Sequence, residues 1–279
     1  MRVPLFVELC AGTAAISLML QGGRYARPPV SRMGSKRGYA AAILECLGLR
    51  PGQGADGYLW CEPDDGCRAM LIAYGDRGLL DEAAAIIRGW ADEEPRALWE
   101  RLRAEGPIRG ADGGEVARWA FVAGAAFIQG DPSTAYAGDP GANGGRMGDV
   151  RTRTAARLDA LPDQPPTAIA ADARAVDPAR LPEGSVVYID PPYVGTTGYT
   201  HDLGRAEVVT LARRWADAGA LVVVSEAEPV SALVAEGWHA VEITGCRVGQ
   251  KRTFSKQQRE WITMSRPPAW TPSVQESLF

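Results

Sequence analysis

The sequence predicts an α/β protein built around one open, mostly parallel β-sheet. Two continuous apolar runs rich in β-branched residues, at 185–189 and 220–225, are typical of strands that are buried on both faces. A third run, at 5–10, leads through a small-residue turn into a helical pattern at 14–21, which is the opening of a nucleotide-binding βα unit. Strand and helix patterns then alternate, which favours parallel strands joined by helices.

Composition indicates an ordinary globular protein. With 279 residues, of which 46% are hydrophobic and 23% charged, the chain can form one large core with an inserted subdomain. It has no run of 18 apolar residues and opens directly on a strand, so we expect a cytoplasmic protein. Its five cysteines contain no Cys-x-x-Cys pair, which predicts neither a disulfide framework nor a metal site.

The basic residues are unevenly distributed. Segments 24–37 and 247–259 each hold five basic residues and no acidic one, and segment 146–157 holds four against one acid, although the whole chain carries a formal charge of −4. This asymmetry suggests a basic face that could follow a phosphate backbone. The alternative is three solvated loops on different sides of the molecule.

The clearest chemical signal is Asp190-Pro191-Pro192-Tyr193, which directly follows the strand at 185–189. Two prolines end the strand, and ligands of open α/β sheets bind beyond the carboxyl ends of the strands. The acid can accept hydrogen bonds from an amine, and the aromatic ring can stack on a flat base. The alternative is a proline-rich turn after a core strand, with Asp190 capping a neighbouring element.

Asp-Pro-Pro-Tyr resembles the catalytic motif of amino-methyltransferases, which move a methyl group from S-adenosylmethionine to an exocyclic nitrogen of adenine, cytosine or guanine. Phe-Val-Glu-Leu-Cys-Ala-Gly-Thr at 6–13 looks like the cofactor motif of the same fold, and together they resemble the Dam-like DNA adenine-N6 methyltransferases. The resemblance implies a Rossmann-like methyltransferase sheet, mostly parallel, that ends in an antiparallel hairpin. Segments 238–243 and 260–265 are expected to form that hairpin.

Residues implied to bind S-adenosylmethionine come from three strand ends. The first strand and its turn would hold the methionine part, an acid after the strand at 58–61 would accept hydrogen bonds from both ribose hydroxyls, and an acid after 167–171 would lie near the adenine ring. Asp64 and Asp65 are close alternatives for the ribose contact. The expected residues are Phe6, Glu8, Cys10, Ala11, Gly12, Thr13, Glu62 and Asp172.

The resemblance divides the chain into a catalytic domain at 1–74 and 161–266, a helical target-recognition insert at 75–160 and a flexible tail at 267–279. Helical patterns at 81–104, broken near Pro95, and at 115–129 support the insert, as does a short basic helix from Arg151. Segment 31–39 looks like the Gly-Gly-Lys segment of Dam-like enzymes, although here it follows the cofactor motif instead of preceding it. We expect contacts to double-stranded DNA from Lys36, Arg37, Arg146, Arg151, Arg153, Lys251 and Arg252.

The expected mechanism follows from the weakness of an adenine amine as a nucleophile, since its lone pair is delocalised into the ring. The Asp190 side chain and the Pro191 carbonyl would accept hydrogen bonds from its two N–H groups, and Tyr193 would stack on the base after it is flipped out of the duplex. Rival hypotheses are cytosine-N4 methylation, guanine-N2 methylation of ribosomal RNA, and a non-catalytic binding module of the same fold.

The C-terminal segment carries a separate pattern. Gln275-Glu276-Ser277-Leu278-Phe279 follows a proline-bounded stretch and resembles the peptide by which bacterial DNA-processing proteins bind the replication sliding clamp. Gln275, Leu278 and Phe279 would make the contacts. The alternative is that Leu278 and Phe279 fold back onto the domain.

Overall fold

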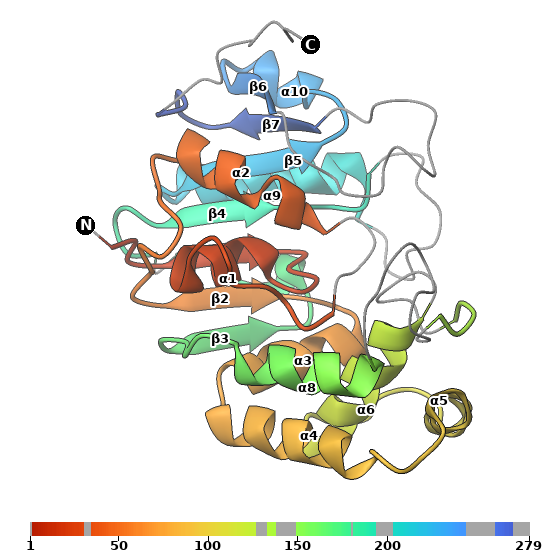
Figure 1. Cartoon of the computed structure of the whole chain (residues 1–279). Helices are drawn as coiled ribbons and strands as arrows, with labels where there is room; N and C mark the ends of the chain where they lie inside the picture. Colours follow the sequence, from red (N-terminus) through yellow and green to blue (C-terminus); the bar gives the residue numbers. More distant parts are fainter. Residues whose placement is uncertain are drawn as a thin grey trace, which may run out of the picture.

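The computed structural model describes residues 2–30, 35–126, 133–137, 149–179, 181–193, 203–243 and 260–269. Its centre is a seven-stranded sheet with the strand order β3-β2-β1-β4-β5-β7-β6 (Figure 1). The fold class expected from the sequence, an α/β protein with a mostly parallel, Rossmann-like sheet, is confirmed at this level. The strands are β1 Phe6–Leu9, β2 Tyr58–Cys61, β3 Thr167–Ala170, β4 Val186–Ile189, β5 Leu221–Glu226, β6 His239–Ile243 and β7 Glu260–Met264.

Strand pairing confirms the expected hairpin at one edge of the sheet. Strands β1 to β5 pair in parallel, and β1 and β4 are direct neighbours with Leu9 opposite Ile189. Strand β7 runs antiparallel between β5 and β6. The amino end of β7 therefore lies beside the carboxyl ends of the parallel strands.

Nine α-helices and two short 3-10 helices occur in the described part of the chain. The helical patterns in the sequence correspond to α1, α4, α5, α6, α8 and α9, whereas α2, α3 and α10 were not anticipated. The α-helices are α1 Ala15–Gly22, α2 Ala40–Cys46, α3 Asp65–Tyr74, α4 Arg77–Gly89, α5 Pro95–Ala104, α6 Gly113–Ala125, α8 Val150–Asp159, α9 Arg205–Asp217 and α10 Ser231–Val234, and the 3-10 helices are η1 Lys36–Gly38 and η2 Ala173–Ala175.

Each face of the sheet has its own apolar core, because alternate residues of a strand point to opposite faces. Phe6 of β1 belongs to the larger core with residues of α1, α2 and α3. Val7 and Leu9 belong to the second core, which α9 and α10 cover. Figure 1 shows α1 and α2 in front of the sheet and α9 behind it. Helices therefore cover both faces, as the buried β-branched strands predicted.

The helical insert is continuous with the main core. Leu80 of α4, Val116 of α6 and Leu158 of α8 are buried in the same cluster as the helices that cover the front of the sheet. Helix α5 packs on α6 through a smaller cluster that includes Trp99 and Phe121. Figure 1 shows these helices beyond the β3 edge. No helix among the described residues is long and apolar enough to cross a membrane.

The crossing of α3 and α6 depends on Gly66. A Cβ atom placed on Gly66 would lie 2.1 Å from Cδ1 and Nε1 of the buried Trp119 ring. We expect Gly66→Ala to lower the free energy of unfolding by about 1–3 kcal/mol, because the two helices would have to separate. Gly89→Ala is the matched control, because a Cβ there would meet no atom within 4 Å. Urea denaturation measures both, and equal effects would contradict the close-packing argument.

Candidate active site

The sheet has a topological switch point between β1 and β4, because the chain continues to β2 on one side and returns through β4 on the other. Ligands of open α/β sheets bind in the crevice outside the carboxyl ends of the strands at such a point. The parallel register brings the turn after Leu9 beside the segment after Ile189, and the Asp190 N–H donates to the Leu9 carbonyl at 3.3 Å. Both motifs from the sequence therefore meet at one crevice.

The turn after β1 has an unusual backbone. Cys10, Gly12 and Ala14 have φ angles of 62°, 54° and 50°, in the left-handed region that non-glycine residues rarely adopt. Such strain persists only where the surroundings hold it, and it concentrates at ligand sites. A Cβ placed on Gly12 would meet no atom within 4 Å. The turn thus presents bare backbone toward open space.

Glu8 holds the start of helix α1. Ala14, at the helix N-cap, makes no side-chain capping bond, and the Ser17 N–H of the first turn donates to Glu8 Oε1 at 2.6 Å instead. Glu8 is only 3% exposed. Burial is the main cause that raises the pKa of Glu8 to about 7, although the bonds from Ser17 oppose the shift. Glu8, in strand β1, therefore caps helix α1 from outside the helix, a contact that sequence patterns could not show.

Glu62 fastens the β1 turn to the end of β2. Its Oε2 accepts the Gly12 N–H at 2.7 Å and its Oε1 accepts the Asp64 N–H at 3.0 Å. Asp64 itself caps α3 through the Cys67 N–H, and Asp65 pairs with Arg68. Glu62 therefore lies at the turn beside the crevice, while Asp64 and Asp65 lie at the start of α3. Which of the three acids would accept ribose hydroxyls stays a prediction.

The other residues expected at the cofactor differ in how far they are exposed. Cys10 is partly exposed, and burial raises the pKa of its thiol, with Glu62 and Asp190 adding to the shift. Phe6 is wholly buried in the core, and Ala11 and Thr13 are buried within the turn. Asp172 lies past the end of β3, where it caps η2 and pairs with Arg174 at 2.9 Å.

The expected catalytic acid, Asp190, belongs to a buried cluster. Lys36 Nζ lies 2.5 Å from Asp190 Oδ1 and 3.9 Å from Glu260 Oε1. The same ammonium lies 4.5 Å from the centre of the Tyr193 ring, a cation–π distance. The Tyr193 hydroxyl donates to Glu260 Oε1. The Lys36 side chain is 4% exposed, whereas Asp190 keeps 20% exposure and so faces the crevice.

Glu226 and Glu260 are site residues that the sequence did not indicate. Glu226 ends β5 and pairs with Arg205 at 3.7 Å. Burial raises its pKa, against the opposing charge of Arg205, and the charge of Asp190 adds to the shift. Glu260 begins β7 and is 1% exposed. An acid at either end of an apolar strand is a common pattern. Glu226 reaches this crevice at the carboxyl end of the parallel strand β5, and Glu260 reaches it because β7 runs antiparallel beside β5.

Lys36 and Arg37, both expected to contact DNA, point to different environments. Lys36 is buried in the cluster with Asp190, so in this arrangement its ammonium is not on the surface that a phosphate could reach. Arg37 is exposed, and its pKa is lowered by partial burial and by the nearby charge of Arg27, which is also exposed. Two cations thus lie together on the surface next to the buried lysine.

Arg151 is tied into the helical insert. Its Nη1 donates to the carbonyls of Trp90, Ala91 and Glu93 at 2.5–3.0 Å, and its side chain also pairs with Asp149. At 11% exposure it holds the loop after α4, which does not fit the expected role in DNA contact. Arg153 is partly buried, and burial lowers its pKa. The remaining predicted contacts lie outside the described residues: Arg146, Lys251, Arg252, Gln275, Leu278 and Phe279.

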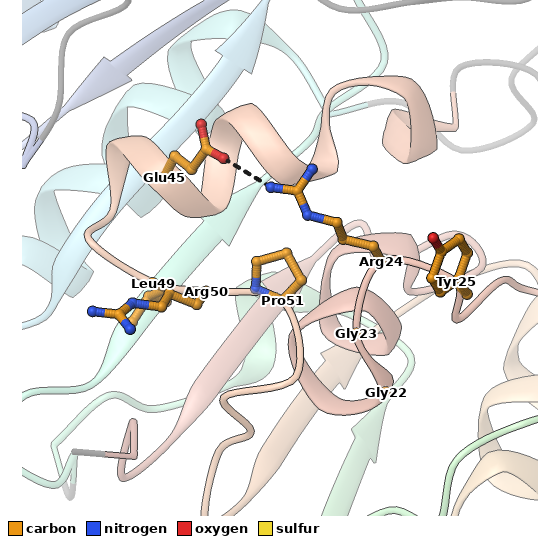
Figure 2. A pocket seen from close by; sticks show the side chains of 8 residues that line it. All are labelled: Gly22, Gly23, Arg24, Tyr25, Glu45, Leu49, Arg50 and Pro51. Atoms are coloured by element: carbon orange, nitrogen blue, oxygen red, sulfur yellow. Dashed lines mark ion pairs between the residues drawn. The ribbon is translucent and has the colours of Figure 1, made fainter.

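A surface cavity of about 560 Å³ lies elsewhere, at the ends of α1 and α2 (Figure 2). Arg24 crosses it to pair with Glu45 at 3.5 Å. Helices α1 and α2 both start near the crevice and end at this cavity. The cavity therefore lies near the amino ends of the parallel strands, on the opposite side of the sheet from the crevice. It brings together none of the residues that the motifs select, so we do not assign the site to it.

Comparison with models of known protein families gave no match to this chain, and comparison with curated proteins gave none either. Within the described residues, no group of three or more His, Cys, Asp or Glu side chains is arranged to hold a metal ion.

The raised pKa of Glu8 makes a prediction about stability. A carboxyl whose pKa is higher in the folded than in the unfolded state stabilises the fold below about pH 4.5, and this contribution is lost as the pH rises through about 7. We expect Glu8→Gln to gain stability relative to wild type by about 3 kcal/mol between pH 4.5 and pH 8. Urea denaturation across this range measures the gain. Glu228→Gln, at an exposed position, should show none, and a difference that is constant with pH would contradict the assignment.

Proposed function

We propose that this protein is an S-adenosylmethionine-dependent methyltransferase that acts on the N6 amine of adenine in DNA. One observation carries the proposal: Asp190-Pro191-Pro192-Tyr193 lies directly beside the strained Gly12 turn, at the switch point of the sheet. The seven-stranded sheet with its antiparallel edge is the form that the resemblance to methyltransferases implies.

The turn after β1 fits the methionine part of the cofactor. Open space over Gly12 allows a ligand to approach the backbone closely. Glu62, held beside the turn by two backbone bonds, is the carboxylate that would accept hydrogen bonds from the ribose hydroxyls. Glu8 lies behind the turn, where ionisation would favour a cationic ligand. S-adenosylmethionine, when bound, supplies an electrophilic methyl group on a sulfonium.

The segment after β4 fits a target base. The partly exposed Asp190 carboxylate can accept a hydrogen bond from an exocyclic amine, and the Pro191 carbonyl, directed by the rigid proline ring, can accept a second. Holding both N–H groups favours the pyramidal nitrogen that attacks a methyl group in line. Tyr193 offers a ring on which the base can stack, which requires that the base leave the duplex.

Methyl transfer is the direct test. We expect the protein to move labelled methyl groups from S-adenosylmethionine to unmethylated genomic DNA, and digestion with mass spectrometry to identify N6-methyladenine. Methylated cytosine, or methylated guanine in ribosomal RNA, would replace the proposed substrate with one of its rivals. No transfer to any of these nucleic acids would contradict the proposal.

Asp190→Ala should reduce transfer to below a few per cent of the wild-type rate, because the amine loses its charged acceptor. Cofactor binding, measured by calorimetry, should stay within a few-fold of wild type, since Asp190 meets the target rather than the cofactor. Asp217→Ala, at the exposed end of α9, is the control for removing an acidic side chain outside the site. Substantial activity in the Asp190 variant would remove the role assigned to this residue.

The exposed pair Arg27 and Arg37 beside the cluster suits a phosphate backbone. Each phosphate contact contributes a slope of about −0.9 to the logarithm of the DNA affinity against the logarithm of salt concentration. We therefore expect Arg37→Glu to flatten the slope by about one contact. Arg50→Glu makes the same charge change beside the cavity at the ends of α1 and α2, away from the crevice. This variant should leave the salt dependence of DNA affinity closer to that of wild type. Identical slopes in the two variants would contradict a DNA face at Arg37.

A further inference from the structure

Glu260 reaches the crevice because of the direction of β7. In an all-parallel sheet, the residue that begins a strand lies at the amino ends of the strands, away from the ligand site at their carboxyl ends. Strand β7 runs antiparallel, with Trp261 opposite Glu226 at the carboxyl end of β5. Glu260, the residue just before Trp261, therefore lies at the same end of the strands as Asp190.

At that position, one carboxylate oxygen contacts three different elements. Glu260 Oε1 accepts the Tyr193 hydroxyl from the segment after β4 and the Ser225 hydroxyl from β5, the latter at 2.5 Å. The Lys36 ammonium, from η1, lies 3.9 Å from the same oxygen. With 1% exposure, Glu260 is shielded from water, so these contacts are not weakened by solvent.

The contact to Tyr193 constrains the orientation of its ring. Burial, together with the charges of Asp190 and Glu260, raises the pKa of Tyr193 far above its ordinary value, so the hydroxyl remains a donor at every working pH. A ring tethered at its hydroxyl and covered by Lys36 at 4.5 Å has few orientations left. The orientation of the Tyr193 ring in the cluster with Asp190 is thereby fixed.

We propose that Glu260 is a positioning residue, which fixes the Tyr193 ring and the Lys36 ammonium against Asp190 without touching the substrate. The inference rests on the proposed function for its catalytic consequence, but not for the contacts themselves. Removal of Glu260 should let the ring turn and remove one of the two carboxylates that hold the Lys36 ammonium in place. A misplacement of about 1 Å can cost about 100-fold in rate.

The contacts can be tested without any activity. In protein labelled with ¹³C at the ζ carbon of its eight tyrosines, the Tyr193 resonance is assigned by its disappearance in Tyr193→Phe, a variant that loses only the hydroxyl. We expect this resonance to move in Glu260→Ala toward the position of exposed tyrosines, and to move less in Glu260→Gln, whose amide oxygen can still accept the bond. A resonance unchanged in both variants would overturn the inference, whether or not the protein transfers methyl groups.

The catalytic consequence is tested in the methyl-transfer assay. We expect Glu260→Ala to lower kcat by about 100-fold with KM for S-adenosylmethionine changed less than about 3-fold, and Glu260→Gln to recover much of the loss. Adding Tyr193→Phe to Glu260→Ala should cost little more, because both changes break the same contact. Fully additive losses, or equal loss in the Gln and Ala variants, would reject the positioning role. Glu228→Gln is the control for charge, and an inactive wild-type protein would reject the proposed function alone.

Discussion

The parallel pairing of β1 with β4 is the constraint on which the rest of the site depends. These strands are distant in the sequence, but their register sets Leu9 opposite Ile189, so the chain leaves the sheet twice at the same edge. The strained turn and the Asp-Pro-Pro-Tyr segment become neighbours for this reason alone. A slip of one residue would send Asp190 to the opposite face, away from Lys36 and Glu260.

The site concentrates negative charge around the Lys36 ammonium, and the Arg205 guanidinium lies 3.7 Å from Glu226 Oε1. Asp190, Glu226 and Glu260 lie close enough to one ammonium, that of Lys36, for their charges to interact. Burying carboxylates is costly unless they are paired, and the raised pKa of Glu226 is consistent with that cost. Burial also keeps the hydrogen bonds of Glu260 strong. Such an arrangement suits a site that must hold polar groups in fixed directions with little water present.

Several elements were predictable because a local pattern determines them. The β-branched runs, the proline stop after β4, the small-residue turn after β1 and the amphipathic helices α4, α5 and α9 all follow from residues near one another in the sequence. The sequence does not predict α2 and α3, since α2 has the short apolar sequence AAAILEC without a polar face and α3 begins within Pro63-Asp64-Asp65, which suggests a turn. Tertiary packing, not propensity, decides such segments.

The sequence by itself determined the fold class, the order of the strands along the chain and the two motifs that meet at the crevice, because strand periodicity and turn chemistry are local. Only the tertiary structure decided the partners of those motifs. Lys36 had the sequence signature of a surface cation and is buried against Asp190, while Arg151 had the same signature and ties down a loop. Glu260 had no signature at all. The physical reason is that charge pairing and burial depend on residues far apart in the chain, which only strand register and direction bring together.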